Sequence, residues 1–391
     1  MLNPQRNQSK QRQGARHAPC FLFFALMLWI IGCEGPAAEK RVGERLMMGS
    51  FASVVVYTPD VSAGDAAIND ALTKMENVDK LMSHYKPESE ISQINRLAGG
   101  EPLKVSPDTF RVIQAAIDYG HQTGGAFDVT IAPLVKSWGF FKHEKRMPSV
   151  TEIQEQRKLV DYKQIQVNDV DITVMLKKAD MQLELGGIAK GYTVDLAAKA
   201  LRWRGITAAL ANLSNSTFFA IGRPPDKPAW KIAIQHPRKK DALLGTVSVK
   251  DEALATSADS EQFFIHNGVR YGHIIDPWTG YPVSNGIVST TVVAPTGMEA
   301  DALATAVFVL GPEKGMEMIQ DRTGVEAIIV REAPTGELII EVSLGLEDRF
   351  EPAQKEVENE SKSTETETDT ALTSLYRTDL PILCQYASDS T

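Results

Sequence analysis

Hydrophobic positions along the chain repeat with the periods of both helices and strands. Residues 65–82 place Ile68, Leu72 and Met75 three or four apart with charged residues between them, which predicts an amphipathic helix. Residues 108–123 and 188–203 repeat this spacing, and a further helix is predicted after Thr296, which is a suitable N-cap. Residues 50–58 (SFASVVVYT) are instead rich in β-branched side chains and predict a strand.

Further short strands follow from apolar runs bounded by turn residues. They are predicted at residues 181–185, 208–212, 217–220, 230–235, 245–250, 253–256, 262–266 and 287–293. The helices and strands do not form a regular βαβ repeat. The pattern therefore predicts an α+β fold, with layered mixed or antiparallel sheets and flanking helices.

The two ends of the chain differ in composition from the part between them. Residues 351–370 are rich in Glu, Lys, Ser and Thr and have almost no large apolar side chains, so they are predicted to be disordered. We expect a signal peptide at 1–32, a tether at 33–44, one globular unit at 45–347 and an acidic tail at 348–391.

The N-terminus has the pattern of an export signal. Basic residues up to Arg16 precede an apolar run at 21–31, which is too short to span a bilayer comfortably. The run ends in Ile30-Ile31-Gly32-Cys33, which resembles a bacterial lipobox and predicts lipid on Cys33. An ordinary secretory signal or an uncleaved anchor are the alternatives. The lipidated form would be exported and held on a bacterial membrane facing the periplasm, with the inner membrane favoured.

Charge and cysteine content exclude several classes of protein. The net charge is −9, and no basic stripe lies outside residues 1–16, which argues against nucleic-acid binding. The three cysteines, Cys20, Cys33 and Cys384, fall in the predicted signal, anchor and tail. Neither a disulfide framework nor a cysteine-based zinc site is therefore expected.

Residues 299–305 (EADALAT) carry a candidate metal site. Asp301 and Thr305 lie four residues apart and would share one face of a small, apolar helix. Both offer hard oxygen donors, which suit Mg²⁺ rather than a soft metal. The alternative is an Asp and a Thr on the exposed side of a surface helix.

Five other segments carry polar residues or glycines that packing alone does not require. They are Met48–Ser50, Ser83–Tyr85 followed by Glu90–Asn95, Gly124–Thr130 followed by Trp138–Phe140, Glu184–Tyr192 and His273–Gly280. In the fourth, two glycines and a helix with Lys190 in its first turn could present backbone amides and a cation to a phosphate. The GxGxxG and GxxxxGK[ST] spacings are absent, which disfavours the Rossmann and Walker types of site. Each segment alone is also compatible with ordinary turns.

Taken together and in order, these segments resemble the ApbE family of FAD:protein FMN transferases, also called flavin transferases. The resemblance runs from about Met47 to Gly311. Its most specific pieces are GAFDVTIAPLVKSWGF, LELGGIAKGYTVDLAA, HIIDPWTGYPV and ADALATAVFVLG. It implies a T-fold-related catalytic unit in an exported, often lipidated, Mg²⁺-dependent enzyme. Such enzymes cleave the pyrophosphate of FAD, attach FMN to a Thr or Ser hydroxyl of a target protein and release AMP. The implied targets are flavoprotein subunits of the Nqr or Rnf type.

The resemblance also implies roles for single residues. It places the FAD site at Met48, Tyr85, Ala126, Phe127, Asp128, Glu184, Lys190 and Ile275. It places Mg²⁺ on Asp301, Thr305 and the backbone carbonyl of Gly187, with Asp301 essential for catalysis. His273 is our candidate for the group that takes the proton from the attacking hydroxyl, because its ordinary pKa is close to neutral, and Asp276 is the next candidate.

One departure from the family pattern lies at residues 212–216, where Asn-x-Gly-Gly-Asp is usual. Ser214 and Asn215 replace the two glycines, and their side chains would narrow the site if this turn approaches the flavin. A milder change is Ala258, where glycine is usual. Two alternatives to the transferase therefore stay open, a Mg²⁺-dependent FAD pyrophosphatase and a non-catalytic FAD-binding lipoprotein.

Overall fold

The computed structural model describes residues 37–141 and 144–353 of the chain. The predicted signal peptide, Cys33 and most of the predicted acidic tail lie outside these residues. Strand β1 (Glu39–Met47) begins inside the predicted tether, and strand β16 (Phe350–Pro352) lies beyond the predicted end of the globular unit at residue 347. The boundaries predicted at residues 45 and 347 therefore need correction at both ends, because paired strands continue past them.

The central element is an eight-stranded sheet with the strand order β1-β2-β6-β7-β10-β13-β14-β15. Its remaining strands are β2 (Ser50–Thr58), β6 (Ala209–Leu213), β7 (Thr217–Ile221), β10 (Ala253–Ala258), β13 (Ile287–Ala294), β14 (Glu326–Glu332) and β15 (Leu338–Val342). Every neighbouring pair in this sheet is antiparallel. The α+β class is confirmed.

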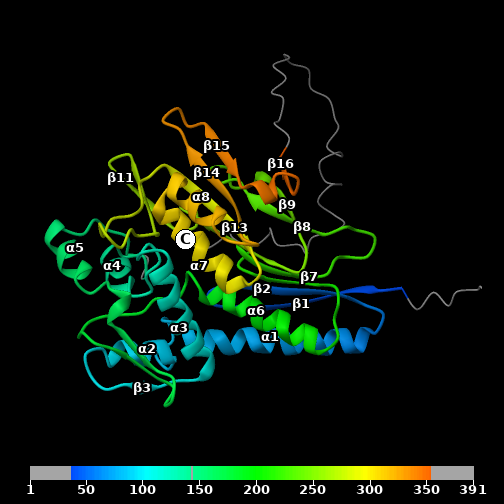
Figure 1. Ribbon diagram of the computed structural model, residues 1–391, viewed down its shortest axis with the longest axis horizontal. Helices are drawn as coiled ribbons and strands as arrows, with labels where there is room; N and C mark the ends of the chain where they lie inside the picture. Colours follow the sequence, from blue (N-terminus) through cyan, green and yellow to red (C-terminus); the bar gives the residue numbers. More distant parts are fainter. Residues whose placement is uncertain (1–36, 142–143, 354–391) are drawn as a thin grey trace, which may run out of the picture. The chain divides into compact units, whose positions relative to one another are not determined.

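Helices cover one face of this sheet and a second sheet covers the other. Helices α1 (Val61–Met82), α6 (Ala189–Trp203) and α7 (Gly297–Leu310) pack on the first face (Figure 1). The sheet of β16, β9 (Leu243–Val249) and β8 (Trp230–Gln235) packs on the second.

Strand β2 shows why both faces are covered. Val54 and Val56 join the helix-side core, whereas Val55 joins the core shared with the second sheet. Successive side chains of a strand point to opposite faces, so a continuous valine run needs an apolar layer on each side.

The other elements build a smaller part beside the helices. They are α2 (Glu90–Arg96), α3 (Pro107–Gln122), α4 (Ala132–Ser137), α5 (Val150–Arg157), the sheet of β3 (Leu103–Lys104), β5 (Thr173–Leu176) and β4 (Ile165–Asn168), the hairpin of β11 (Phe263–His266) and β12 (Val269–Gly272), and a 3-10 turn at Tyr162–Gln164. Helix α8 (Pro312–Gln320) packs instead against α7 and β14, and a 3-10 turn at Leu344–Leu346 places Leu346 in the core between the two sheets. No helix among the described residues is both long and apolar enough to cross a membrane.

The strand predicted at residues 181–185 is wrong. This segment is extended but joins no sheet. The amide of Asn95 takes the place of a partner strand: its Nδ2 donates to the Leu183 carbonyl at 3.0 Å and its Oδ1 accepts from the Leu183 N–H at 2.6 Å. Glu184 N–H donates to the Val129 carbonyl at 2.8 Å. A side chain and a loop thus satisfy the backbone polar groups that a sheet would otherwise pair.

Candidate functional site

A cavity of about 620 Å³ opens where the large sheet, α6, α7 and the loops around His273 meet. The predicted site residues that line it are Met48, Tyr85, Ala126, Phe127, Asp128, Glu184, Gly187, Lys190, His273, Ile275 and Thr305. Asp301 is not part of the lining. It is buried directly beside Lys190, with only 2% of its surface exposed. The structure thus brings together residues that are far apart in the sequence.

The predicted metal ligands lie close to one another at one wall of this cavity. Thr305 Oγ1 is 3.4 Å from the Asp301 carbonyl oxygen and 3.3 Å from Ser257 Oγ. Gly187 packs so tightly against Thr305 that an added Cβ would lie 3.1 Å from Thr305 Oγ1. A side chain at this position would require Thr305 or Phe127 to shift by a few tenths of an ångström.

The two carboxylate oxygens of Asp301 have different surroundings. Oδ2 accepts a hydrogen bond from Gly191 N–H at 2.9 Å, which fixes the side chain. Oδ1 lies 3.9 Å from Lys190 Nζ, beyond hydrogen-bond distance, and so keeps lone pairs for a cation. With the Thr305 hydroxyl and the backbone at Gly187, this is a hard-oxygen donor set that fits Mg²⁺.

Charge in this part of the cavity is unbalanced toward negative. Burial raises the pKa of Asp301, and Lys190 opposes this effect. Burial also lowers the pKa of Lys190, but the carboxylates of Asp301, Glu261 and Glu184 outweigh it and the net pKa is raised. A single ammonium group thus faces three carboxylates, which favours binding of a further cation.

The turn before α6 is held by its own side chains. Glu184 Oε1 accepts from Gly186 N–H at 2.6 Å, and Lys190 Nζ donates to the Gly186 carbonyl at 3.2 Å. These contacts hold the turn against the start of α6, where the Ala189 N–H donates to the Leu185 carbonyl at 2.8 Å and the Gly191 N–H donates to Asp301.

An aromatic group at the cavity contains two residues to which the sequence gave no role. The ring of His84 lies 3.8 Å from the Tyr85 ring and 4.3 Å from the Phe141 ring, measured between centroids. His84 Nδ1 is 3.7 Å from Glu184 Oε1, and burial lowers the pKa of His84. Because His84 is next to the predicted site residue Tyr85, the sequence offered a signal that it lies at the cavity. The sequence offered no such signal for Phe141.

Asp128 shapes the cavity wall through bonds inside the protein. Its Oδ1 accepts from Thr130 N–H at 2.8 Å and from Thr130 Oγ1 at 2.6 Å, and its Oδ2 accepts from Tyr162 N–H at 3.0 Å. Burial raises the pKa of Asp128, and these hydrogen bonds oppose the shift. The carboxylate therefore fixes the loop that places Ala126 and Phe127 at the cavity.

Two hairpin turns at the cavity contain residues with positive φ. Met48 and Gly49, between β1 and β2, have φ of 51° and 68°. Ser214 and Asn215, between β6 and β7, have φ of 61° and 53°. Bulky residues rarely adopt this conformation, and strained positions cluster at functional sites.

Ser214 and Asn215, which the resemblance marked as a departure from the family pattern, both line the cavity. Asn215 is fixed there by Asn212, whose Nδ2 donates to Asn215 Oδ1 at 2.8 Å and whose Oδ1 accepts from Asn215 N–H at 3.1 Å. The turn is thereby held in one conformation.

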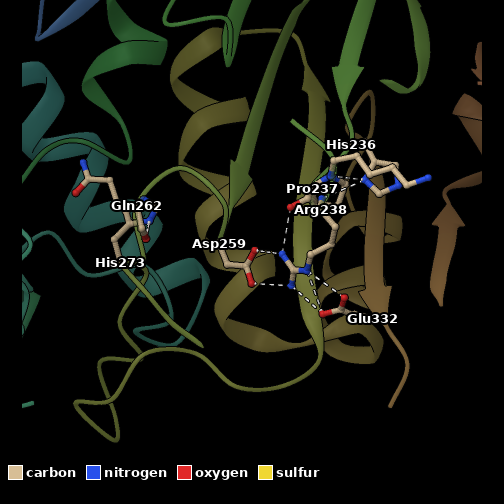
Figure 2. A network of polar contacts seen from close by, with 8 residues as sticks. His236, Pro237, Arg238, Asp259, Gln262, His273 and Glu332 are labelled. Carbon is tan, nitrogen blue, oxygen red and sulfur yellow. Dashed lines mark hydrogen bonds and ion pairs between the residues drawn. The ribbon is translucent and has the colours of Figure 1, made fainter. Parts of the chain in front are cut away.

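His273 faces the cavity from the segment after β12. Its backbone N–H donates to the Gln262 carbonyl at 3.0 Å, and its ring nitrogen Nδ1 lies 3.3 Å from the same oxygen (Figure 2). Burial lowers the pKa of His273, Glu261 opposes this and Lys190 adds to it, with a net lowering. Asp276 is less available, since its Oδ1 accepts from the N–H groups of Trp278 at 2.7 Å and Thr279 at 3.3 Å.

Comparison with known proteins agrees with this geometry. The profile of the ApbE family matches residues 48–329. A protein of Treponema pallidum named FAD:protein FMN transferase is 32% identical, with 77% of this chain and 87% of the relative covered. A protein of the same name from Vibrio cholerae is 31% identical, with 76% and 89% covered.

Solved structures agree as well. The crystal structure of the ApbE protein of Thermotoga maritima matches with a TM-score of 0.71 at 31% identity, covering 78% of this chain and 98% of that one. The flavin transferase ApbE from Vibrio cholerae matches with a TM-score of 0.71 at 30% identity, covering 80% and 99%. The match over most of the chain, in sequence and in fold, shows that this protein belongs to the ApbE family.

Proposed function

We propose that this protein transfers FMN from FAD to a Ser or Thr hydroxyl of a target protein, with Mg²⁺, and releases AMP. Membership of the ApbE family and relatives named FAD:protein FMN transferase support the transfer. The observation that carries the proposal is the convergence of Asp301, Thr305, Gly187 and Lys190 at one wall of the cavity. Hard oxygen donors and a cation at one place suit a pyrophosphate with its metal.

In the proposed reaction, the acceptor hydroxyl oxygen attacks the phosphorus on the FMN side of the pyrophosphate. A new P–O bond forms to the target protein, the P–O bond to the bridging oxygen breaks, and the electron pair leaves with AMP. Mg²⁺ bound by Asp301, Thr305 and the Gly187 carbonyl would supply positive charge to the pyrophosphate oxygens. Lys190 adds a second positive charge at that wall.

His273 takes the proton of the attacking hydroxyl in this proposal. The Gln262 carbonyl near Nδ1 accepts only if Nδ1 carries the proton, which leaves the lone pair on Nε2. A lowered pKa keeps the ring neutral at pH 7 and so able to accept a proton.

The proposed setting is a bacterial membrane that faces the periplasm, with the inner membrane favoured. The lipobox-like sequence before Cys33 supports a lipid anchor. The proposed acceptor is a flavoprotein subunit of the Nqr or Rnf type.

Incubation with FAD, Mg²⁺ and a peptide carrying a Ser/Thr-Gly-Ala-Thr acceptor tests the proposal. We expect FMN covalently bound to the peptide in amounts equal to the AMP released, and no AMP release with EDTA. Free FMN with AMP and an unmodified peptide would indicate a pyrophosphatase. Unchanged FAD that copurifies with the protein would indicate a flavin-binding lipoprotein.

A further inference from the structure

Arg238 forms a polar cluster with Asp259 and Glu332 near the cavity but does not line it. Its Nη1 and Nη2 donate to the two oxygens of Asp259 at 2.6 and 2.9 Å, and its Nε and Nη2 donate to Glu332 at 3.0 to 3.1 Å (Figure 2). Only 19% of the Arg238 side chain is exposed. One guanidinium thus holds two carboxylates from different strands in the planar geometry that arginine favours.

The three residues come from two layers of the fold. Arg238 follows β8 of the three-stranded sheet, whereas Asp259 follows β10 and Glu332 ends β14 of the eight-stranded sheet. The cluster therefore joins the two sheets beside the cavity.

The Asp259 side of this cluster leads to His273 by two contacts. A Cβ added to Gly272, the residue before His273, would lie 3.3 Å from Asp259 Cβ, so the two backbones pass very close together. Three residues after Asp259, the Gln262 carbonyl accepts from His273 N–H at 3.0 Å and lies 3.3 Å from His273 Nδ1. Glu261, between these contacts, lines the cavity.

We infer that Arg238 is a positioning residue for His273: it fixes Asp259, and through it the segment 259–262 whose Gln262 carbonyl orients the imidazole ring toward the cavity. This inference rests on the proposed function for its catalytic part. The role is mechanical, because the guanidinium contacts Asp259, Glu332 and the Pro237 carbonyl, and none of these holds the phosphate or the metal in that proposal.

Removal of the guanidinium has a definite structural consequence. Without Arg238, the carboxylates of Asp259 and Glu332 face each other without the cation that both contact. Two carboxylates that contact the same guanidinium are close enough to repel each other once it is removed, and an unpaired, partly buried carboxylate moves toward water. The segment 259–262 would follow Asp259, and the Gln262 carbonyl would leave the ring of His273.

The test uses the full-length protein with Arg238→Met, which keeps much of the side-chain length but not the charge. We expect kcat for FMN transfer to the peptide to fall about tenfold, with KM for FAD within about twofold, because the chemical step and not substrate binding depends on the ring orientation. Asp259→Asn should reproduce the fall in kcat while leaving the Arg238–Glu332 pair in place. Arg238→Lys should lie between Arg238→Met and the wild type, since an ammonium cannot hold both carboxylates in the same fork.

A double-mutant cycle separates positioning from general loss of structure. In a His273→Ala background, Arg238→Met should cause no further fall in kcat, because the ring that it orients is gone. An equal fall in both backgrounds would overturn the inference. Arg331→Met is the matched control: Arg331 donates to Glu341 at 2.7 Å at the other side of the same sheet, and its loss should leave kcat unchanged.

Amide hydrogen exchange provides a readout that does not need turnover. Exchange at the His273 N–H should be at least tenfold faster in Arg238→Met than in the wild type, and unchanged in Arg331→Met. Unchanged exchange at His273 in Arg238→Met would overturn the inference even if FMN transfer fails in every variant. Absence of transfer in the wild type, with faster exchange in Arg238→Met, would instead contradict the proposed function alone.

Discussion

His273 and Asp276 lie three residues apart, yet the structure separates their chemistry. The Asp276 carboxylate accepts two backbone N–H groups of its own turn, whereas His273 binds a carbonyl through its backbone and faces the cavity. A proton acceptor needs a free lone pair directed at the substrate. At the residue scale, this favours His273 over Asp276 as the base.

The pH dependence of transfer follows from the shifted pKa of His273. Burial, with Lys190 adding and Glu261 opposing, holds this pKa below its ordinary value of 6.5. In the proposed mechanism the neutral ring is the active form, so the rate should be on its plateau at pH 7 and fall only as the pH drops through the lowered pKa. A stopped-time assay of FMN transfer between pH 5 and 8 measures this.

His273→Gln should remove the fall in the FMN transfer rate at low pH. It should also lower the rate at pH 7 roughly 10²- to 10⁴-fold, which is the usual contribution of general base catalysis. FAD binding, measured by fluorescence quenching, should be retained. Unchanged transfer in a folded His273→Gln protein would show that the base lies elsewhere, with Asp276 next to be tested.

Asp301→Asn addresses the metal without relying on turnover. The amide is nearly isosteric and can still accept from Gly191 N–H, but it lacks the charge that attracts Mg²⁺. We expect the apo protein to fold as well as the wild type, because burial disfavours the ionised carboxylate. The rise in melting temperature caused by Mg²⁺ in the presence of FAD should be lost.

Glu299→Gln supplies the matched control for Asp301→Asn. Glu299 lies one half-turn earlier on α7 and does not line the cavity. In Glu299→Gln, the rise in melting temperature caused by Mg²⁺ should equal that of the wild type. Loss of this rise in both variants would contradict the proposed ligand role of Asp301.

The placement of a residue is predictable from the sequence where a local motif contains the whole signal. Asp301 and Thr305 share one helix, so their spacing alone predicted that they lie on one face. Glu261 and Phe141 reach the same cavity from segments with no motif, and only the tertiary fold brings them there. The hydrogen bonds of Arg238 join residues 21 and 94 positions away in the sequence, beyond what a local pattern can indicate.

At the element scale, the crossing of α6 and α7 places the metal candidate residues. A Cβ on Gly191 would lie 2.0 Å from the Gly297 carbonyl oxygen, and a Cβ on Gly297 would lie 2.4 Å from the Gly191 carbonyl oxygen. Asp195 adds to this crossing by accepting from the N–H groups of Gly297 at 2.6 Å and Met298 at 3.0 Å. Only glycine allows the two helices to meet so closely, and this contact brings Gly191 N–H to Asp301.

Gly191→Ala should therefore destabilise the protein. Alanine favours a helix over glycine by roughly 1 kcal/mol, but overpacking against backbone costs about 1–3 kcal/mol and wins here. We expect a net loss of about 1–2 kcal/mol in the free energy of unfolding, measured by urea denaturation. Lys199→Ala on the exposed side of the same helix should change it by less than about 0.5 kcal/mol. Equal stability of Gly191→Ala and the wild type would show that the helices can move apart freely.

The sequence predicted helices and strands most reliably where a hydrophobic repeat continued over many residues. The amphipathic spacing of residues 65–82 predicted α1, and the structure extends it back to Val61 because Asp60 caps the helix by accepting from Ala63 N–H. The segment 181–185 has the composition of a strand, but its partner is the Asn95 side chain from a different helix. Sequence pattern cannot reveal a partner that comes from so far along the chain.

At the scale of the described fold, three layers stack with the large sheet in the middle: helices cover one of its faces and the three-stranded sheet covers the other. The α+β class followed from the mixture of elements, but the strand order did not. A short turn joins β6 to β7, whereas long segments separate β2 from β6, β7 from β10 and β10 from β13, and periodicity does not predict how such strands pair. The second sheet also closes with β16, which pairs with β9 and inserts Phe350 into the core between the sheets. Its residues lie at the point where the sequence composition changes, so composition alone placed the boundary at residue 347.

The contribution of β16 can be measured by comparing two shortened chains, one that ends at Glu347 and one that ends at Ala353. Both lack residues 354–391, so they differ only in residues 348–353, which contain β16 and Arg349, whose Nε donates to the Ser248 carbonyl at 3.0 Å. Phe350 is only 8% exposed, and loss of a buried Phe side chain costs about 3–5 kcal/mol. The chain ending at Glu347 should be less stable by about that amount, measured by urea denaturation, because the open edge of β9 also loses its partner. In the longer chain, Phe350→Ala should reproduce most of the loss. Equal stability of the two shortened chains would mean that β16 adds nothing to the fold and that the boundary at residue 347 is adequate.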